Sequence, residues 1–123
     1  MDHPFADLIG LQVVECDSNT SEVSLTVRPE LLNPNGVAHG AVLYALADTG
    51  MGAAIAYSLG KDEICATVEI KINYFKAVYE GTVSCTSRVV NRGKRLANVE
   101  SDVFASGRLV ARANGNFAIF TPG

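Results

Sequence analysis

Residues 39–60 read HGAVLYALADTGMGAAIAYSLG, and Asp48 carries the only formal charge among them. An apolar run of this length predicts one long helix. An acid near the centre of a membrane-spanning helix would cost about 3 kcal/mol, and polar, strand-like sequence lies on both sides of this run. We therefore expect a long helix buried inside a soluble protein, and no membrane association.

The sequence on either side of this helix predicts six strands. Residues 4–9 predict a short helix that Gly10 ends. Alternating apolar residues and clusters of turn formers then predict strands at 11–16, 22–28, 68–75, 81–90, 95–105 and 109–120. Strands that follow one another without intervening helices exclude repeated βαβ units. We expect a single α+β domain, residues 1–123, with a meandering six-stranded antiparallel sheet.

The long helix also predicts self-association. A helix of about 21 residues is about 30 Å long, and a helix that is apolar all round must be covered on most sides. One sheet of six strands wraps only part of such a helix. A second copy of the chain is expected to cover the rest.

Composition narrows the class of function. The chain has 123 residues and a formal charge of −3, with a pI of about 5.3, which argues against a nucleic-acid-binding protein. The three cysteines (Cys16, Cys65 and Cys85) have no metal-ligand spacing, so we expect reduced thiols, no metal site and a cytoplasmic protein. Residues 1–10 contain no apolar run typical of an export signal.

Asp48 is the first candidate for chemistry. A buried carboxylate without partners costs several kcal/mol, so it must be hydrogen-bonded, protonated or turned toward a wet cleft. It either ties the helix to neighbouring backbone, or acts as a general base or nucleophile.

His39 and Gly40 stand at the start of the same helix. Unpaired N–H groups and the positive end of the dipole suit this position for polarising a carbonyl oxygen, and Gly40 leaves room for a substrate to approach. Alternatively, His39 only caps the helix. His39 and Asp48 are about 13.5 Å apart along the axis and face opposite ways, so one shared site would need two chains.

Three further features each have two interpretations. Asn33 either initiates the turn at residues 33–36 or holds a carbonyl or a water. The Thr67 hydroxyl orients a water, or the residue is simply a strand former. Four basic side chains surround one hairpin with Gly93 at its apex, either as a solvated tip or as a phosphate site: Arg88, Arg92, Lys94 and Arg95.

Together these segments resemble the hot-dog-fold acyl-CoA thioesterases, in particular their phenylacetate-degradation (PaaI-like) branch. The resemblance lies in residues 33–41 (NPNGVAHGA), 46–50 (LADTG), 66–75 (ATVEIKINYF) and 93–97 (GKRLA), and it extends over essentially the whole chain. It implies a six-stranded antiparallel sheet wrapped around the central helix. It also implies a homodimer or homotetramer with active sites at the dimer interface and no cofactor.

The resemblance implies a role for each candidate residue. Asp48 would be the base or nucleophile, the Gly40 N–H would polarise the thioester carbonyl, and His39 would support that corner. Asn33 would position the thioester or a water, and Thr67 would orient water. The residues that would bind the phosphates of coenzyme A are Arg92, Gly93, Lys94 and Arg95.

The implied reaction is hydrolysis of an acyl-CoA, for example of the aryl or phenylacetyl type, to the free acid and coenzyme A. The alternative is a non-catalytic acyl-CoA-binding or regulatory protein on the same fold. One departure concerns residue 41, where the family commonly has a second glycine after His-Gly. The methyl group of Ala41 is expected to narrow the mouth of the site.

Overall fold

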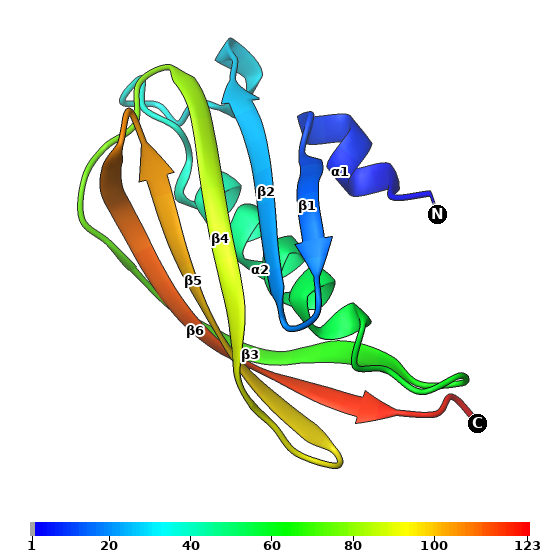
Figure 1. Ribbon diagram of the computed structural model, residues 1–123. Helices are drawn as coiled ribbons and strands as arrows, with labels where there is room; N and C mark the ends of the chain where they lie inside the picture. The colour runs from blue at the N-terminus through cyan, green and yellow to red at the C-terminus, as the bar shows by residue number, and fades with distance from the viewer. Residues whose placement is uncertain (1) are drawn as a thin grey trace.

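The protein is built around helix α2 (Gly40–Ala56), which lies on the concave side of a curved antiparallel sheet (Figure 1). The computed structural model describes residues 2–123. The other elements are α1 (Pro4–Ile9), the 3₁₀ turn η1 (Pro29–Leu31), β1 (Gln12–Asp17), β2 (Thr20–Val27), β3 (Ile64–Tyr74), β4 (Gly81–Arg92), β5 (Leu96–Ala105) and β6 (Arg108–Phe120). The expected α+β hot-dog fold is confirmed.

Strand order departs from a simple meander. The six strands lie in the order β1-β2-β4-β5-β6-β3, and every pair is antiparallel. Strand β3 follows α2 in the chain but pairs with β6, which makes it an edge strand. The reason is that α2 carries the chain across the concave side of the sheet before β3 begins (Figure 1).

Helix α2 is shorter than the sequence pattern predicts, ending at Ala56 rather than at residue 60. The Ser58 N–H donates to the Ile55 carbonyl at 2.8 Å, and the Ser58 hydroxyl donates to the same oxygen at 2.7 Å. A side chain that bonds to the preceding turn competes with the helical pattern, and the helix closes there. None of the helices in residues 2–123 is long and apolar enough to cross a membrane.

The sheet covers most, but not all, of α2. Leu46, Met51 and Ile55 are fully buried against the strands, and burying each such side chain contributes about 1.5–3 kcal/mol. A stripe of residues at four-residue spacing stays partly or fully exposed: Tyr44, Asp48, Gly52 and Ala56. Within residues 2–123, no element fully covers this stripe. This agrees with the expectation that one sheet of six strands wraps only part of the long helix.

A β-bulge in β3 decides which of its side chains face α2. The pairing with β6 shifts between Thr67 and Glu69, so Val68 is the extra residue and is 59% exposed. The alternating sequence predicts Val68 on the same face as Ile70. The bulge instead turns Thr67 toward α2 while Ile70 still packs against the core, since one extra residue reverses the alternation.

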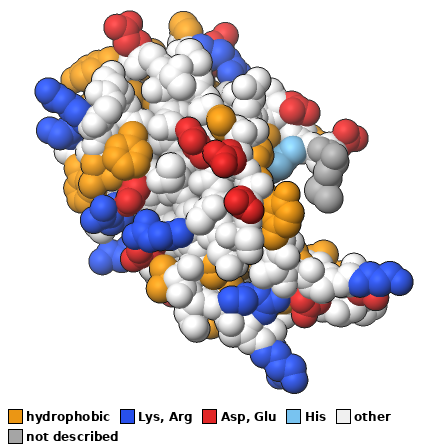
Figure 2. Space-filling model, in the orientation of Figure 1, with side chains coloured by type: hydrophobic (Ala, Val, Ile, Leu, Met, Phe, Trp, Pro, Cys, Tyr) orange, Lys and Arg blue, Asp and Glu red, His pale blue; other side chains and the backbone are white. Residues whose placement is uncertain are grey.

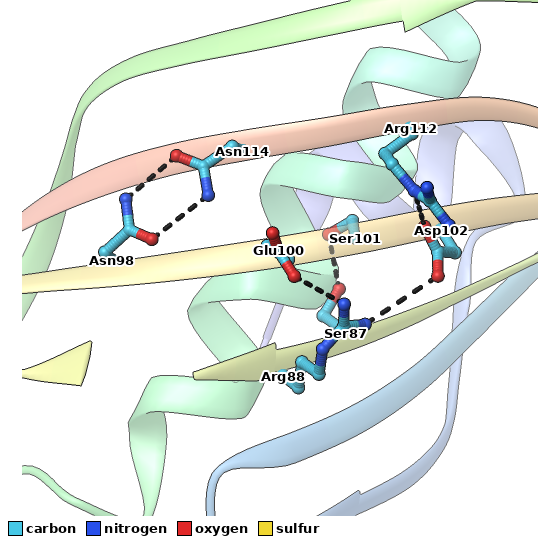
Figure 3. A network of polar contacts seen from close by, with 8 residues as sticks. All are labelled: Ser87, Arg88, Asn98, Glu100, Ser101, Asp102, Arg112 and Asn114. Carbon is cyan, nitrogen blue, oxygen red and sulfur yellow. Dashed lines mark hydrogen bonds and ion pairs between the residues drawn. The ribbon is translucent and has the colours of Figure 1, made fainter. Parts of the chain in front are cut away.

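The outer face of the sheet is polar and cross-linked between strands. Arg88 on β4 pairs with Glu100 and Asp102 on β5, and the Arg112 Nε donates to Asp102 Oδ1 at 2.7 Å (Figure 3). The side-chain amides of Asn98 and Asn114 exchange two hydrogen bonds of 2.8 and 3.0 Å. Basic and acidic side chains are accordingly interspersed on the surface (Figure 2).

Gly115 on β6 provides a test of how tightly the bulge, the sheet and α2 fit together. A methyl group at position 115 would lie 2.8 Å from Met51 Sδ, 2.9 Å from Ile70 Cγ1 and 3.2 Å from the Glu69 carbonyl. We expect Gly115→Ala to lower the free energy of unfolding by about 1–3 kcal/mol, measured by urea denaturation. Gly60→Ala is the matched control, because its added methyl meets only the flexible Glu63 side chain; equal midpoints for the two variants would contradict this packing.

Candidate active site

Asp48 lies at the middle of α2, on the stripe that the sheet leaves uncovered, and is partly exposed. The Thr67 hydroxyl donates to Asp48 Oδ1 at 2.7 Å. Within residues 2–123 no donor reaches the second carboxylate oxygen. A carboxylate with one oxygen held and the other open toward solvent is oriented and still able to accept a proton or attack a carbon. The sequence marks Thr67 only as a hydroxyl residue at the start of the long strand after the helix. Its contact with Asp48 depends on the bulge.

The first turn of α2 offers one unpaired donor. His39 is the N-cap: its Nδ1 accepts the Ala41 N–H at 2.9 Å, and its carbonyl accepts the Val42 N–H at 2.8 Å. In the part of the chain that the structure describes, the Gly40 N–H has no acceptor. The capping role of His39 is therefore observed, and it leaves the Gly40 N–H as the free donor at the positive end of the helix dipole.

Tyr74, which residue type and spacing do not single out, fixes the position of Gly40. Its hydroxyl donates to the Gly40 carbonyl at 2.8 Å, and its ring fills the space where a Cβ on residue 40 would lie, at 3.2 Å from Cζ. Tyr74 therefore occupies the space on the Cβ side of Gly40, and the approach of a substrate to the Gly40 N–H stays a prediction. Burial, followed by the nearby Tyr44, raises the pKa of the Tyr74 hydroxyl and keeps it a neutral donor.

Asn33 holds the turn that precedes α2. Its Oδ1 accepts the N–H groups of Asn35 at 2.9 Å and Val37 at 3.3 Å, an arrangement in which the side chain completes the turn. The turn-forming interpretation of Asn33 is therefore observed. No acceptor within residues 2–123 takes the side-chain NH₂ group, so the amide keeps two donors for another partner.

The structure separates the five candidate catalytic residues into two groups within one chain. Asn33, His39 and Gly40 lie at the start of α2, whereas Asp48 and Thr67 lie about 12 Å further along the helix axis. One chain thus contains both halves of the predicted site without joining them.

The basic hairpin lies at the opposite end of α2 from Gly40. Arg92 is bonded inside the chain: its Nε donates to Ser58 Oγ at 2.9 Å, its Nη2 donates to the Ser58 carbonyl at 3.0 Å, and it pairs with Glu63. Gly93 closes the turn through its N–H to the Leu96 carbonyl at 2.8 Å. Lys94 and Arg95 are exposed, so of the predicted phosphate ligands these two cations are the ones turned to solvent.

Two of the three cysteines, Cys65 and Cys85, are poor nucleophiles. All three are free. Burial, and then the charge of Asp48, raises the pKa of the Cys65 thiol, while burial raises the pKa of Cys85 to about 11. Since the thiolate is the nucleophilic form, Cys65 stays a neutral thiol near neutral pH although it lies beside the candidate site. Asp48 is then the group best placed for the chemistry.

A comparison with known protein families identifies the family of this chain. The family model of the thioesterase superfamily matches residues 35–111, a segment that runs from the turn before α2 into β6. The chain belongs to the thioesterase superfamily.

The relatives include both solved structures and a named hydrolase. Conserved protein PA5202 from Pseudomonas aeruginosa superimposes with a TM-score of 0.93 at 39% identity, over 98% of this chain and 96% of that one. A mutant of the phenylacetic acid degradation protein PaaI from Thermus thermophilus gives a TM-score of 0.88 at 29% identity, over 94% and 98%. A 1,4-dihydroxy-2-naphthoyl-CoA hydrolase from Listeria monocytogenes is 30% identical over 88 residues, 72% of each chain.

Proposed function

We propose that the protein is an acyl-CoA thioesterase whose active site joins Asp48 of one subunit to the Gly40 N–H of another. The observation that carries the proposal is the Asp48 carboxylate itself, held at one oxygen by Thr67 on an otherwise apolar helix and open at the other. The relatives support the reaction class, since one of them is named as a CoA-thioester hydrolase.

The exposed surface supports the two-subunit arrangement. The uncovered stripe of α2 adjoins the edge strand β3, which exposes four large apolar side chains along and just beyond its length: Ile64, Val68, Tyr74 and Phe75. An unpaired, apolar strand edge favours association with another chain. Two copies related by a two-fold axis bring the same surfaces together twice, so each dimer would hold two sites. Pairs of such dimers would give the homotetramer.

The proposed chemistry uses both halves of the site. The carbonyl oxygen of the thioester accepts the Gly40 N–H and gains negative charge as the carbonyl carbon is attacked. Asp48 either removes a proton from the attacking water or adds to the carbon itself and forms an anhydride that water then hydrolyses. The carbon–sulfur bond breaks in both routes, and coenzyme A leaves as the thiolate. The free NH₂ of Asn33 would hold the thioester or the water.

Replacing Asp48 tests the reaction directly. Asp48→Asn keeps an acceptor for Thr67 but loses the basic carboxylate, so we expect kcat to fall by about 10²–10⁴-fold with little change in melting temperature. The measurement is release of free thiol from a panel of aryl-, phenylacetyl-, medium- and long-chain acyl-CoAs. Asp62→Asn, on the exposed loop after α2, is the matched control. Tight binding of these esters by the wild-type protein without turnover would favour the non-catalytic alternative and overturn the proposal.

Replacing Gly40 with proline removes the backbone N–H donor at the start of α2. Proline is well tolerated at the first position of a helix, and His39 already has the extended backbone that a following proline requires, with φ −59° and ψ 139°. Gly40→Pro lacks the N–H, while Gly40→Ala adds a comparable Cβ beside Tyr74 and keeps it. We expect kcat of the proline variant to be about 10²–10³-fold below that of the alanine variant. Equal kcat values would remove the Gly40 N–H from the mechanism.

The basic hairpin is proposed to bind the phosphates of coenzyme A through Lys94 and Arg95 around Gly93, with Arg92 holding the hairpin to α2. We expect Lys94→Met to raise KM for an acyl-CoA about three- to tenfold, and to leave KM for the corresponding acyl-pantetheine, which carries no phosphate group, unchanged. An equal rise in KM for both substrates in Lys94→Met would contradict the phosphate contact.

We expect Arg92→Met to lower the free energy of unfolding by about 1–3 kcal/mol, because Ser58 and Glu63 lose their partner.

A further inference from the structure

An apolar cleft lies between α1, η1 and the first two turns of α2. Its volume is about 290 Å³. The side chains that define its walls come from all three elements: Phe5, Ile9, Leu31, Ala41, Val42 and Ala45. The fold thus builds a small hydrophobic site from segments that lie far apart in the sequence.

The cleft is suited to an uncharged ligand. Glu30 is the only carboxylate on its rim; that side chain is 73% exposed and pairs with Arg28 at 3.6 Å, which keeps its charge outside. Phe5 in contrast is 54% exposed, although it forms part of the apolar wall. An aromatic ring left half in water beside an apolar hollow gains free energy when an apolar group fills that hollow.

The cleft adjoins the proposed carbonyl site. His39 and Ala41 line it, and these residues flank Gly40 on both sides in the chain. A group attached to a carbonyl carbon held by the Gly40 N–H is therefore within reach of the cleft. The hollow on the other side of Gly40 is less apolar, since Lys76 and the Tyr74 hydroxyl contribute to it.

The wall that α1 contributes is fixed. The Arg28 Nη2 donates to the Leu8 carbonyl at 2.6 Å, and Gly10 caps the helix in a left-handed conformation with φ 75°. The Leu11 N–H donates to the Ala6 carbonyl at 2.8 Å. A cleft with such a wall selects ligands by size, because the wall cannot move away without breaking these bonds.

From these observations we infer that the cleft receives the acyl group of the substrate, and that Phe5 and Ala41 set the length of that group. The inference rests on the proposed thioesterase function and assigns its substrate class. A volume of about 290 Å³ lies just below the range of about 300–1,000 Å³ found for small-molecule sites, which fits an aromatic or medium-chain acyl group better than a long chain. The Ala41 methyl lines the cleft, and in this proposal it provides the narrowing that the sequence predicts.

The test compares kcat/KM along a series from acetyl- to palmitoyl-CoA, together with benzoyl- and phenylacetyl-CoA. For the wild-type protein we expect about a fourfold gain for each added methylene up to a medium chain, and then a fall. Phe5→Ala should move the optimum to longer chains, by about two to four carbons. Ala41→Leu should fill the cleft and lower kcat/KM at least tenfold for the preferred substrate, while acetyl-CoA changes less than threefold.

Leu8→Ala is the matched control, since Leu8 is exposed on α1 and does not line the cleft; its chain-length profile should equal that of the wild type. Inhibition by free coenzyme A should be unchanged in Phe5→Ala and Ala41→Leu. Unshifted profiles in both variants would overturn the inference while leaving an Asp48-dependent thioesterase intact. A changed oligomeric state in both, seen by light scattering, would also overturn it, because the partner subunit and not the acyl group would then fill the cleft.

Acyl-CoA binding tests the cleft independently of hydrolysis. It therefore applies even if the wild-type protein hydrolyses none of these esters and the proposed function fails. Calorimetric titration of the Asp48→Asn variant with octanoyl-CoA and with coenzyme A alone measures the contribution of the acyl group to binding. We expect octanoyl-CoA to bind at least tenfold more tightly than coenzyme A, and this ratio to fall to about one when Ala41→Leu is added. A ratio that Ala41→Leu leaves unchanged would place the acyl group elsewhere.

Discussion

The covering of α2 is the constraint on which the other features depend. An apolar helix must be shielded from water, and the curved sheet fully buries side chains such as Leu46, Met51 and Ile55. The stripe that contains Tyr44 and Asp48 stays open in a single chain. An unfinished hydrophobic core and a held carboxylate therefore occupy the same face of one helix. The burial that completes the fold and the assembly of the proposed site would be one event.

The bulge at Val68 links the edge strand to the chemistry. Without the extra residue, Thr67 and Ile70 could not both face α2, and the hydrogen bond between Thr67 and Asp48 would be lost or the core would lose Ile70. At its C-terminal end the same strand places Tyr74 against Gly40. Strand β3 thus holds both ends of the proposed site, at positions about 12 Å apart on α2.

Sequence patterns predict much of the architecture. The long helix follows from one unbroken apolar run, its uncovered side from the length of that run, and the strands and hairpins from alternation and turn residues. Three features do not follow from spacing. The bulge at Val68 depends on how β3 pairs with β6, so the simple alternation puts the wrong side chain inward. Tyr74 contacts Gly40 across 34 residues, and Arg92 bonds to Ser58 across another 34. Such contacts form only in the tertiary structure. From residue type alone, Arg92 and Lys94 are equally good candidates for binding phosphate.

Asp48 and the Gly40 N–H are proposed to act on one thioester from two different subunits. Co-expression of Asp48→Asn and Gly40→Pro chains with different affinity tags, followed by purification on both tags, yields hybrids of two inactive parents. In a hybrid dimer one site carries both substitutions and the other carries neither, so thiol release should recover to about half of the wild-type value per dimer. Hybrids that contain both chains but stay as inactive as the parents would contradict a site shared between subunits.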